Sequence, residues 1–207
     1  MRLVSISDTH NKHEDLQLPD ADILIHCGDF TEGGSKKETL NFLEWFSKQP
    51  HTHKILVAGN HDFYLEKHQQ EISNIIPNNI IYLEDSGINI KGINFWGSPY
   101  TPSNVNWAFA LERGKRIKEK WNMIPEDTHI LITHTPPYSI HDESIEYKNI
   151  GCEELLKKVV DIKPRFHLFG HVHDDFGSKK IGTTTFINSS VMDNKSRLIN
   201  KISVFEI

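Results

Sequence analysis

The chain has 207 residues, 37% of them hydrophobic and 25% charged, which suits a soluble globular protein with one sizeable core. Its formal net charge of −5 argues against a broad basic surface that would bind long nucleic acid. No apolar run reaches the length of a membrane span, and the first motif starts too near the N-terminus to leave room for a signal peptide, so we expect a cytoplasmic protein.

Short apolar, β-branched runs alternate with segments of helical periodicity. In chain order we expect strands at Leu3–Ser7 and Ile23–Cys27, a helix at Lys36–Lys48, a strand at Ile55–Ala58, a helix at Tyr64–Ile76, strands at Ile80–Leu83, Ile88–Ile90 and Ile93–Trp96, a helix at Leu111–Trp121, a strand at Ile130–Thr133, a helix at Glu153–Val160, and strands at Phe166–Phe169, Thr184–Ile187 and Ile202–Ile207.

The order of these elements indicates the fold class. Early alternation of strand and helix predicts parallel strands with helices outside, and strand-turn-strand stretches such as Ile80–Trp96 predict antiparallel additions. We therefore expect an α/β fold with a two-layer sheet core flanked by helices. No linker, repeat or low-complexity tract interrupts the chain, so we expect a single domain over residues 1–207.

Polar side chains follow five of the predicted strands. The segments are Asp8-Thr-His10, Gly28-Asp29, Gly59-Asn60-His61-Asp62, Thr133-His134 and Gly170-His171-Val-His173. Taken singly, each has an ordinary explanation as a turn, a helix cap or a buried structural histidine. In α/β sheets, however, functional groups lie beyond the carboxyl ends of strands, and five such ends each deliver Asp, Asn or His. The joint pattern predicts a metal site.

The five segments, in this order, resemble the signature of the calcineurin-like metallophosphoesterases. Further matches resemble the small metallophosphodomain-containing subgroup, whose members are similar to class III cyclic-nucleotide phosphodiesterases. These matches include Trp96-Gly-Ser-Pro-Tyr100, Thr133-His-Thr-Pro-Pro137 and Phe186-Ile-Asn-Ser189. The resemblance implies a four-layer α-β-β-α fold, with two mixed sheets packed face to face as a sandwich.

The same resemblance implies roles for individual residues. Asp8, His10 and His173 would bind one metal ion, Asn60, His134 and His171 a second, and Asp29 would bridge them. A hydroxide between the two metals would attack phosphorus, and His61, which is left over, would donate a proton to the leaving group. Mixed nitrogen and oxygen ligation suits two divalent transition-metal ions: Mn²⁺ first, with Fe, Zn²⁺, Co²⁺ or Ni²⁺ as alternatives.

The substrate is less tightly constrained. The loop after Asp29 carries no arginine to clamp a phosphomonoester dianion, which favours a small phosphodiester such as a cyclic nucleotide. The aromatic-rich segment Phe95–Phe109 could stack on a base or simply pack onto the core. Three alternatives stay open: a phosphomonoesterase, a nuclease for short single strands, and a catalytically silent scaffold. We expect a small phosphate ester as partner and no membrane; the oligomeric state is left open.

Overall fold

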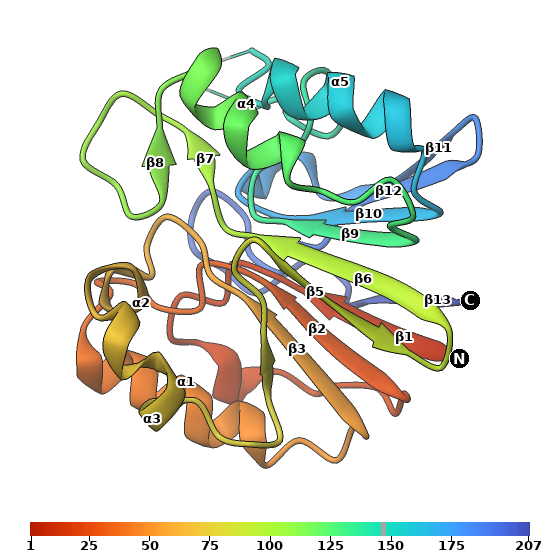
Figure 1. Ribbon diagram of the computed structural model, residues 1–207. Coiled ribbons are helices and arrows are strands. Elements are labelled where there is room, and N and C mark those ends of the chain that lie inside the picture. The colour runs from red at the N-terminus through yellow and green to blue at the C-terminus, as the bar shows by residue number, and fades with distance from the viewer. Residues whose placement is uncertain (146–147) are drawn as a thin grey trace.

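The computed structural model describes residues 1–145 and 148–207 (Figure 1). Its strands are β1 (Arg2–Ile6), β2 (Ile23–Cys27), β3 (His53–Val57), β4 (Ile81–Tyr82), β5 (Ser86–Ile90), β6 (Ile93–Ser98), β7 (Thr101–Pro102), β8 (Ala110–Leu111), β9 (Ile130–Thr133), β10 (Phe166–Phe169), β11 (Gly177–Ile181), β12 (Thr184–Asn188) and β13 (Ser203–Glu206). Its α-helices are α1 (Lys36–Ser47), α2 (Phe63–Lys67), α3 (Ile72–Ile75), α4 (Lys115–Asn122) and α5 (Glu153–Ile162).

Two mixed sheets form the centre of the molecule. The first has the order β13-β1-β2-β3-β4, in which β13 is antiparallel and the others are parallel. The second has the order β11-β12-β10-β9-β6-β5, in which β11 and β5 are antiparallel edge strands. Figure 1 shows α1 to α3 outside the first sheet and α4 and α5 outside the second. The expected α/β sandwich flanked by helices is confirmed.

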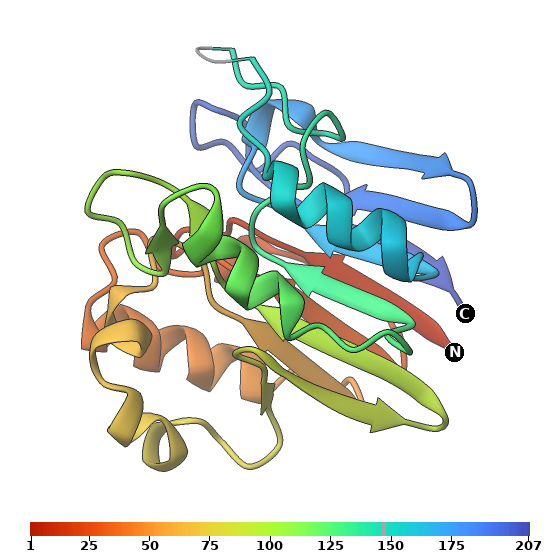
Figure 2. The same cartoon turned by 45° about the horizontal axis from the view of Figure 1, so that its top comes forward.

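Three apolar clusters hold these layers together. Between the sheets, residues such as Ile25, Ile55, Ile132 and Leu168 are buried and in mutual contact. Helix α1 begins at a capping box formed by Ser35 and Glu38 and buries Phe42 and Phe46 beneath the first sheet. Helices α4 and α5 cover the second sheet with residues that include Trp121 and Leu155 (Figure 2). Within the described residues, no helix is both long and apolar enough to cross a membrane.

The structure corrects three of the expected elements. The helix expected over Leu111–Trp121 begins only at Lys115, and Leu111 lies in β8. The helix expected over Tyr64–Ile76 is broken at His68, because the backbone leaves the helical region there, with φ −124° and ψ 43°. The His68 amide still donates to the Tyr64 carbonyl at 3.1 Å, and the His68 imidazole Nδ1 lies 3.1 Å from the same oxygen. The expected antiparallel pairing within Ile80–Trp96 is wrong for the first strand of that stretch. β4 joins the first sheet in parallel, whereas β5 and β6 form an antiparallel pair in the second.

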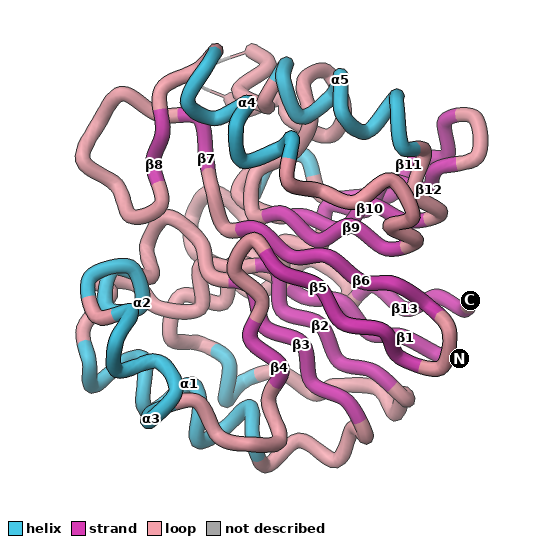
Figure 3. The backbone as a smooth tube through the Cα atoms, in the orientation of Figure 1, coloured by secondary structure: helices cyan, strands magenta, loops and turns pink. Residues whose placement is uncertain are grey.

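The two sheets meet where their parallel strands end. Ser7, just beyond β1, forms a bridge with Ser190, just beyond β12, and the hydroxyls of Ser5 and Ser189 lie 2.7 Å apart. Loops leave both sheets at these carboxyl ends (Figure 3). Every side chain singled out for the metal site therefore enters the same region from one sheet or the other.

The packing of α1 predicts a specific stability difference. Phe42 is fully buried and stacks on Phe30, which directly follows Asp29, with ring centroids 4.3 Å apart. Phe42→Ala is expected to lower the free energy of unfolding by about 3–5 kcal/mol because it leaves a cavity under this loop. Leu40 on the same helix is 41% exposed, so Leu40→Ala should cost less than about 1.5 kcal/mol. Urea titration of both variants makes the comparison, and equal losses would contradict this view of the core.

Candidate metal centre

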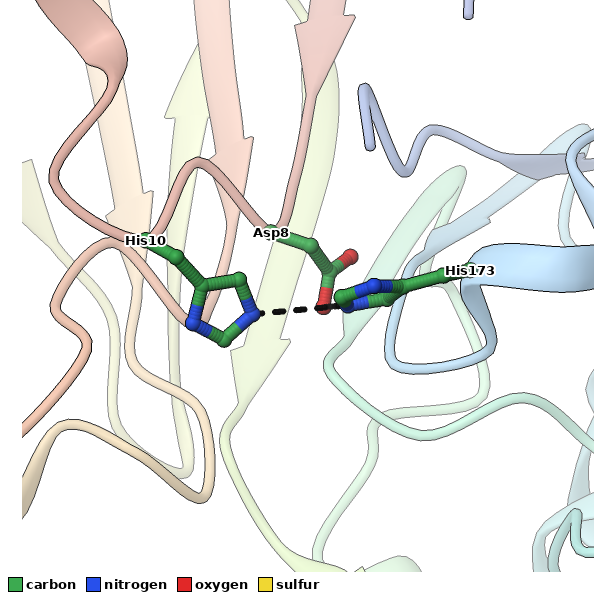
Figure 4. Close-up of side chains that lie close together, drawn as sticks. All are labelled: Asp8, His10 and His173. Carbon is green, nitrogen blue, oxygen red and sulfur yellow. Dashed lines mark hydrogen bonds and ion pairs between the residues drawn. The ribbon is translucent and has the colours of Figure 1, made fainter. Parts of the chain in front are cut away.

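The predicted ligands converge from both sheets onto one site. Asp8, His10 and His173 form one cluster (Figure 4), and Asp29, His134 and His171 form another. Within each cluster the candidate ligand atoms lie within 4.8 Å of one another. Asn60 joins the second cluster, since its Oδ1 lies 2.9 Å from His134 Nε2. The first sheet provides Asp8, His10, Asp29 and Asn60, and the second provides His134, His171 and His173.

The imidazoles are oriented by oxygen atoms behind them. His134 Nδ1 donates to the Cys27 carbonyl at 2.9 Å, and His173 Nδ1 lies 3.3 Å from the Asp193 carbonyl. His10 Nδ1 lies 3.4 Å from Glu32 Oε2 without forming a hydrogen bond. In each of the three rings Nε2 is the nitrogen that lies near the Asp8 or Asp29 carboxylate. A backbone carbonyl or carboxylate behind a histidine is the usual arrangement for holding an imidazole as a metal ligand.

The inward atoms are spaced as ligands of small ions would be. His10 Nε2 and His173 Nε2 lie 3.4 Å apart, and His173 Nε2 lies 3.4 Å from Asp8 Oδ1. In the second cluster His134 Nε2 lies 3.2 Å from Asp29 Oδ2. Two donors each about 2.1 Å from one ion are roughly 3.0–3.5 Å apart. The donors therefore fit divalent transition-metal ions. Asp29 Oδ2 is also 4.0 Å from His10 Nε2, which places this carboxylate between the clusters.

The charges of the buried carboxylates and imidazoles also indicate a metal site. Burial raises the pKa of the Asp8 carboxyl, but the hydrogen bond and charge of His173 outweigh burial and hold that pKa below its usual range. The pKa of Asp29 is likewise held low, mainly by His134. Burial would lower the pKa values of His134 and His173, but Asp29 and Asp8 raise both to about 9. The two buried carboxylates thus require nearby positive charge, which metal ions would supply as they displace these protons.

The backbone turns sharply at four of these residues. Asp8, His10, Asp29 and His171 have φ values of 57°, 38°, 55° and 69°, in the left-handed region that non-glycine residues rarely adopt. Hydrogen bonds between the loops stabilise these turns: the Asp8 amide donates to the Gly28 carbonyl at 2.9 Å, and the His10 amide donates to the Asp29 carbonyl at 3.1 Å. Such strain is characteristic of functional sites held by their surroundings.

At two of the motif glycines, Gly59 and Gly170, the structure leaves no space for a side chain. A Cβ atom at Gly59 would collide with Asp29 Oδ1, and one at Gly170 would collide with Ser7 Oγ and Asp8 Oδ2. These glycines were interpreted from the sequence as turn residues. In the structure they let the loops from the two sheets approach the carboxylates closely.

Asp62 ties two ligand loops together. It is fully buried; Oδ2 accepts from the amides of Gly59 and Asp29, and Oδ1 accepts from the amide and hydroxyl of Thr31, at 2.7–3.0 Å. Burial and the charge of Asp29 raise the pKa of Asp62 to about 7, despite these donors. Asp62 thus connects its own turn to the Asp29 loop.

A cleft of about 350 Å³ opens over the ligands and exposes residues that the sequence analysis did not select. Besides ligands and His61, its lining includes Glu32, Trp107, Asn194 and Ser196. Trp107 lay within the aromatic segment already noted, but nothing in the pattern distinguished it from its neighbours. Asn194 and Ser196 follow no strand and match no motif, so only the fold brings them to the site.

The contacts of Asp62 predict the effect of replacing it. In Asp62→Asn, either orientation of the amide directs an NH₂ group at backbone N–H donors. We expect the free energy of unfolding to fall by about 2–4 kcal/mol because buried donors lose their acceptor. Thr31→Val is the graded control: it removes the hydroxyl, which lies 2.7 Å from Asp62 Oδ1 and 3.0 Å from the His61 carbonyl, and keeps the Thr31 amide bond to Asp62, at a cost of about 1 kcal/mol. Urea unfolding measures the stability of both variants. If Asp62→Asn is as stable as the wild type, Asp62 does not stabilise these loops.

Comparisons with known proteins agree with this geometry. The family model described as calcineurin-like phosphoesterase matches residues 1–175. The chain is similar over its whole length to human metallophosphoesterase domain-containing protein 1, at 38% identity and 71% coverage of that protein. It is also similar to UPF0046 protein K07C11.7 of Caenorhabditis elegans, at 38% identity and 75% coverage of that relative.

A solved structure shares the fold at low sequence identity. The crystal structure of the protein TT1561 of Thermus thermophilus covers 99% of this chain and 97% of its own, with a TM-score of 0.64 at 14% identity. Together with the family match over residues 1–175, these findings show that the chain belongs to the calcineurin-like phosphoesterase family.

Proposed function

We propose that this protein is a dinuclear-metal-dependent phosphodiesterase that hydrolyses small phosphodiesters. Membership of the calcineurin-like phosphoesterases supports hydrolysis of a phosphate ester. The observation that supports a diester in particular is the charge of the cleft. Among the residues that the structure describes, its lining contains the Glu32 carboxylate and neither lysine nor arginine.

Two divalent transition-metal ions are part of the proposal. Asp8, His10 and His173 would bind one ion and Asn60, His134 and His171 the other, with Asp29 shared; Mn²⁺ is our first choice. When bound, such ions supply a hydroxide nucleophile at neutral pH and neutralise phosphoryl oxygens. Seven candidate donors gathered from two sheets are too many for one tetrahedral site.

His61 is positioned to assist departure of the leaving group. Its Nδ1 donates to the Glu32 carbonyl at 2.7 Å, and its backbone amide donates to Asp29 Oδ1, also at 2.7 Å. With Nδ1 so engaged, Nε2 is the nitrogen available to a substrate in the cleft. Hydrolysis adds water across the P–O ester bond. With both ring nitrogens protonated, His61 would give its Nε2 proton to the departing oxygen, keep its Nδ1 bond to the Glu32 carbonyl, and regain a proton from solvent.

The charge argument separates diesters from monoesters. A phosphodiester carries one negative charge, whereas a terminal phosphomonoester carries up to two and benefits from a fixed guanidinium clamp. In this cleft the additional charged side chain is Glu32, whose exposure of 63% leaves it at the opening. Its carboxylate opposes a dianion more than a monoanion. The volume of about 350 Å³ suits a small ester better than a long strand.

Metal content tests the dinuclear centre. Wild-type protein saturated with Mn²⁺ is expected to approach two ions per chain by elemental analysis, and metal should raise the Tm of the chelator-treated protein. Asp29→Asn should lower occupancy of both sites because both share this carboxylate. Asp20→Asn, which changes an exposed carboxylate, is the control and should retain both ions. One ion or none in the saturated wild type would refute the dinuclear proposal.

Substrate preference tests the charge argument. We expect kcat/KM for a phosphodiester to exceed that for the monoester of the same leaving group in the wild type. Glu32→Gln should reduce this preference by roughly 3- to 10-fold, because it removes a partly screened charge that acts against the dianion. Glu14→Gln serves as control, since Glu14 is exposed and outside the cleft lining. A wild-type preference for the monoester, or an unchanged ratio in Glu32→Gln, would contradict the argument.

A further inference from the structure

Trp107 is the aromatic residue of the segment Phe95–Phe109 that lines the cleft. Phe95 and Phe109 are buried, and Trp96 and Tyr100 pack against the cluster beneath α4 and α5. Trp107, by contrast, remains 40% exposed, and it is the aromatic of this fully described segment found in the cleft lining. A large apolar ring left open beside a polar metal centre is therefore a candidate contact for substrate.

The indole lies beside His61. The two ring centroids are 4.7 Å apart with 31° between the ring planes, and the ring centroids of Trp107 and Phe63 are 6.1 Å apart. His61 also contacts His10, at 4.7 Å between centroids, and His10 contacts His173 at 5.2 Å. The order of contacts is thus Trp107, His61, His10, His173. Trp107 is in direct contact with the residue proposed to protonate the leaving group.

The backbone around Trp107 is fixed to the site. The Ala108 amide donates to the carbonyl of Asn60 at 3.0 Å, and the Phe109 amide donates to Glu66 Oε1 at 2.7 Å. Ala108 and Phe109 are buried. The loop carrying the indole is therefore anchored to a candidate ligand residue and does not lie loosely over the cleft. A rigid, partly open aromatic ring can accept a flat partner at small entropic cost.

We propose that Trp107 forms the leaving-group subsite and selects esters whose departing group is an aromatic ring or base, by stacking, while it also positions the His61 imidazole. This inference rests on the proposed phosphodiesterase function. In the reaction, water adds to phosphorus, the P–O bond to the aromatic alcohol breaks, and its oxygen takes the proton from His61. The indole contributes by binding the departing ring, and it takes no part in bond making.

Two diesters that share a methyl group distinguish stacking from the positioning of His61. Methyl phenyl phosphate and methyl hexafluoroisopropyl phosphate have leaving groups of similar acidity, but only the first is aromatic. Trp107→Ala is expected to lower kcat/KM for the phenyl ester by about 10- to 100-fold and to lower it much less for the alkyl ester. Trp107→Phe should restore most of the difference, and Trp107→Leu should not.

Val105→Ala is the matched control, because Val105 lies in the same loop with its side chain 61% exposed and outside the cleft lining. It should leave both rates unchanged. Metal content and Tm of every variant confirm that the site is intact. If Trp107→Ala lowers kcat/KM equally for the two esters, Trp107 only positions His61, and the proposed subsite is overturned.

A binding measurement keeps this test separate from the proposed function. Phenylphosphonate and methylphosphonate have no ester bond, and their affinities for the Mn²⁺-loaded protein can be compared by calorimetry. We expect the phenyl compound to bind about tenfold more tightly to the wild type and to lose that advantage in Trp107→Ala. This result would support the subsite even if neither diester were hydrolysed. Absence of hydrolysis would refute only the proposed phosphodiesterase activity. Equal affinities for the wild type would overturn the subsite.

Discussion

Two buried carboxylates impose the constraint on which the rest of this site depends. Asp8 and Asp29 are almost inaccessible to solvent and are held in their charged form by imidazoles. Their partners, His173 and His134, come from the opposite sheet. Neither sheet alone could bury these carboxylates, because an uncompensated charge in the interior is strongly unfavourable. Packing of the two sheets and formation of the site therefore stabilise each other.

The surrounding backbone maintains this arrangement. Left-handed turns at Asp8 and Asp29, close approach at Gly59 and Gly170, and the four hydrogen bonds accepted by Asp62 restrict the loops to one conformation. The Nδ1 atoms of His134 and His173 are directed toward backbone carbonyls, so their Nε2 atoms face the carboxylates. Such preorganisation lets ligands bind metal with little rearrangement, and it accounts for the concentration of strained residues at this end of the sandwich.

The cleft above the centre carries the features that bear on substrate. Glu32 contributes its carbonyl to His61 and its carboxylate to the opening, and the Trp107 ring packs against the same imidazole. A negative charge and an aromatic surface therefore lie close to the residue proposed as proton donor. This combination favours an ester of low charge with a flat leaving group. His61 contacts both residues, so the proposed proton transfer and the proposed substrate selectivity depend on the same side chain.

The sequence alone predicted most strands well, since buried strands leave continuous apolar runs: Ile23–Cys27, Ile130–Thr133 and Phe166–Phe169 agree in both bounds. It failed at Tyr64–Ile76, where the backbone leaves the helical region at His68 although no glycine or proline marks the break. It also failed at Gly177–Ile181, an edge strand whose side chains are mostly exposed and leave no apolar pattern.

The candidate ligands were also accessible to sequence reasoning, because residues after parallel strands emerge at one edge of a sheet. The resemblance to a known family assigned them to two metal ions, and the geometry brings together the clusters that this assignment requires. The sequence thus determined which residues could make the site. Only the tertiary structure decided that Glu32, Trp107, Asn194 and Ser196 share the cleft, because contacts between loops of different sheets depend on how the sheets pack and leave no periodic signal in the chain.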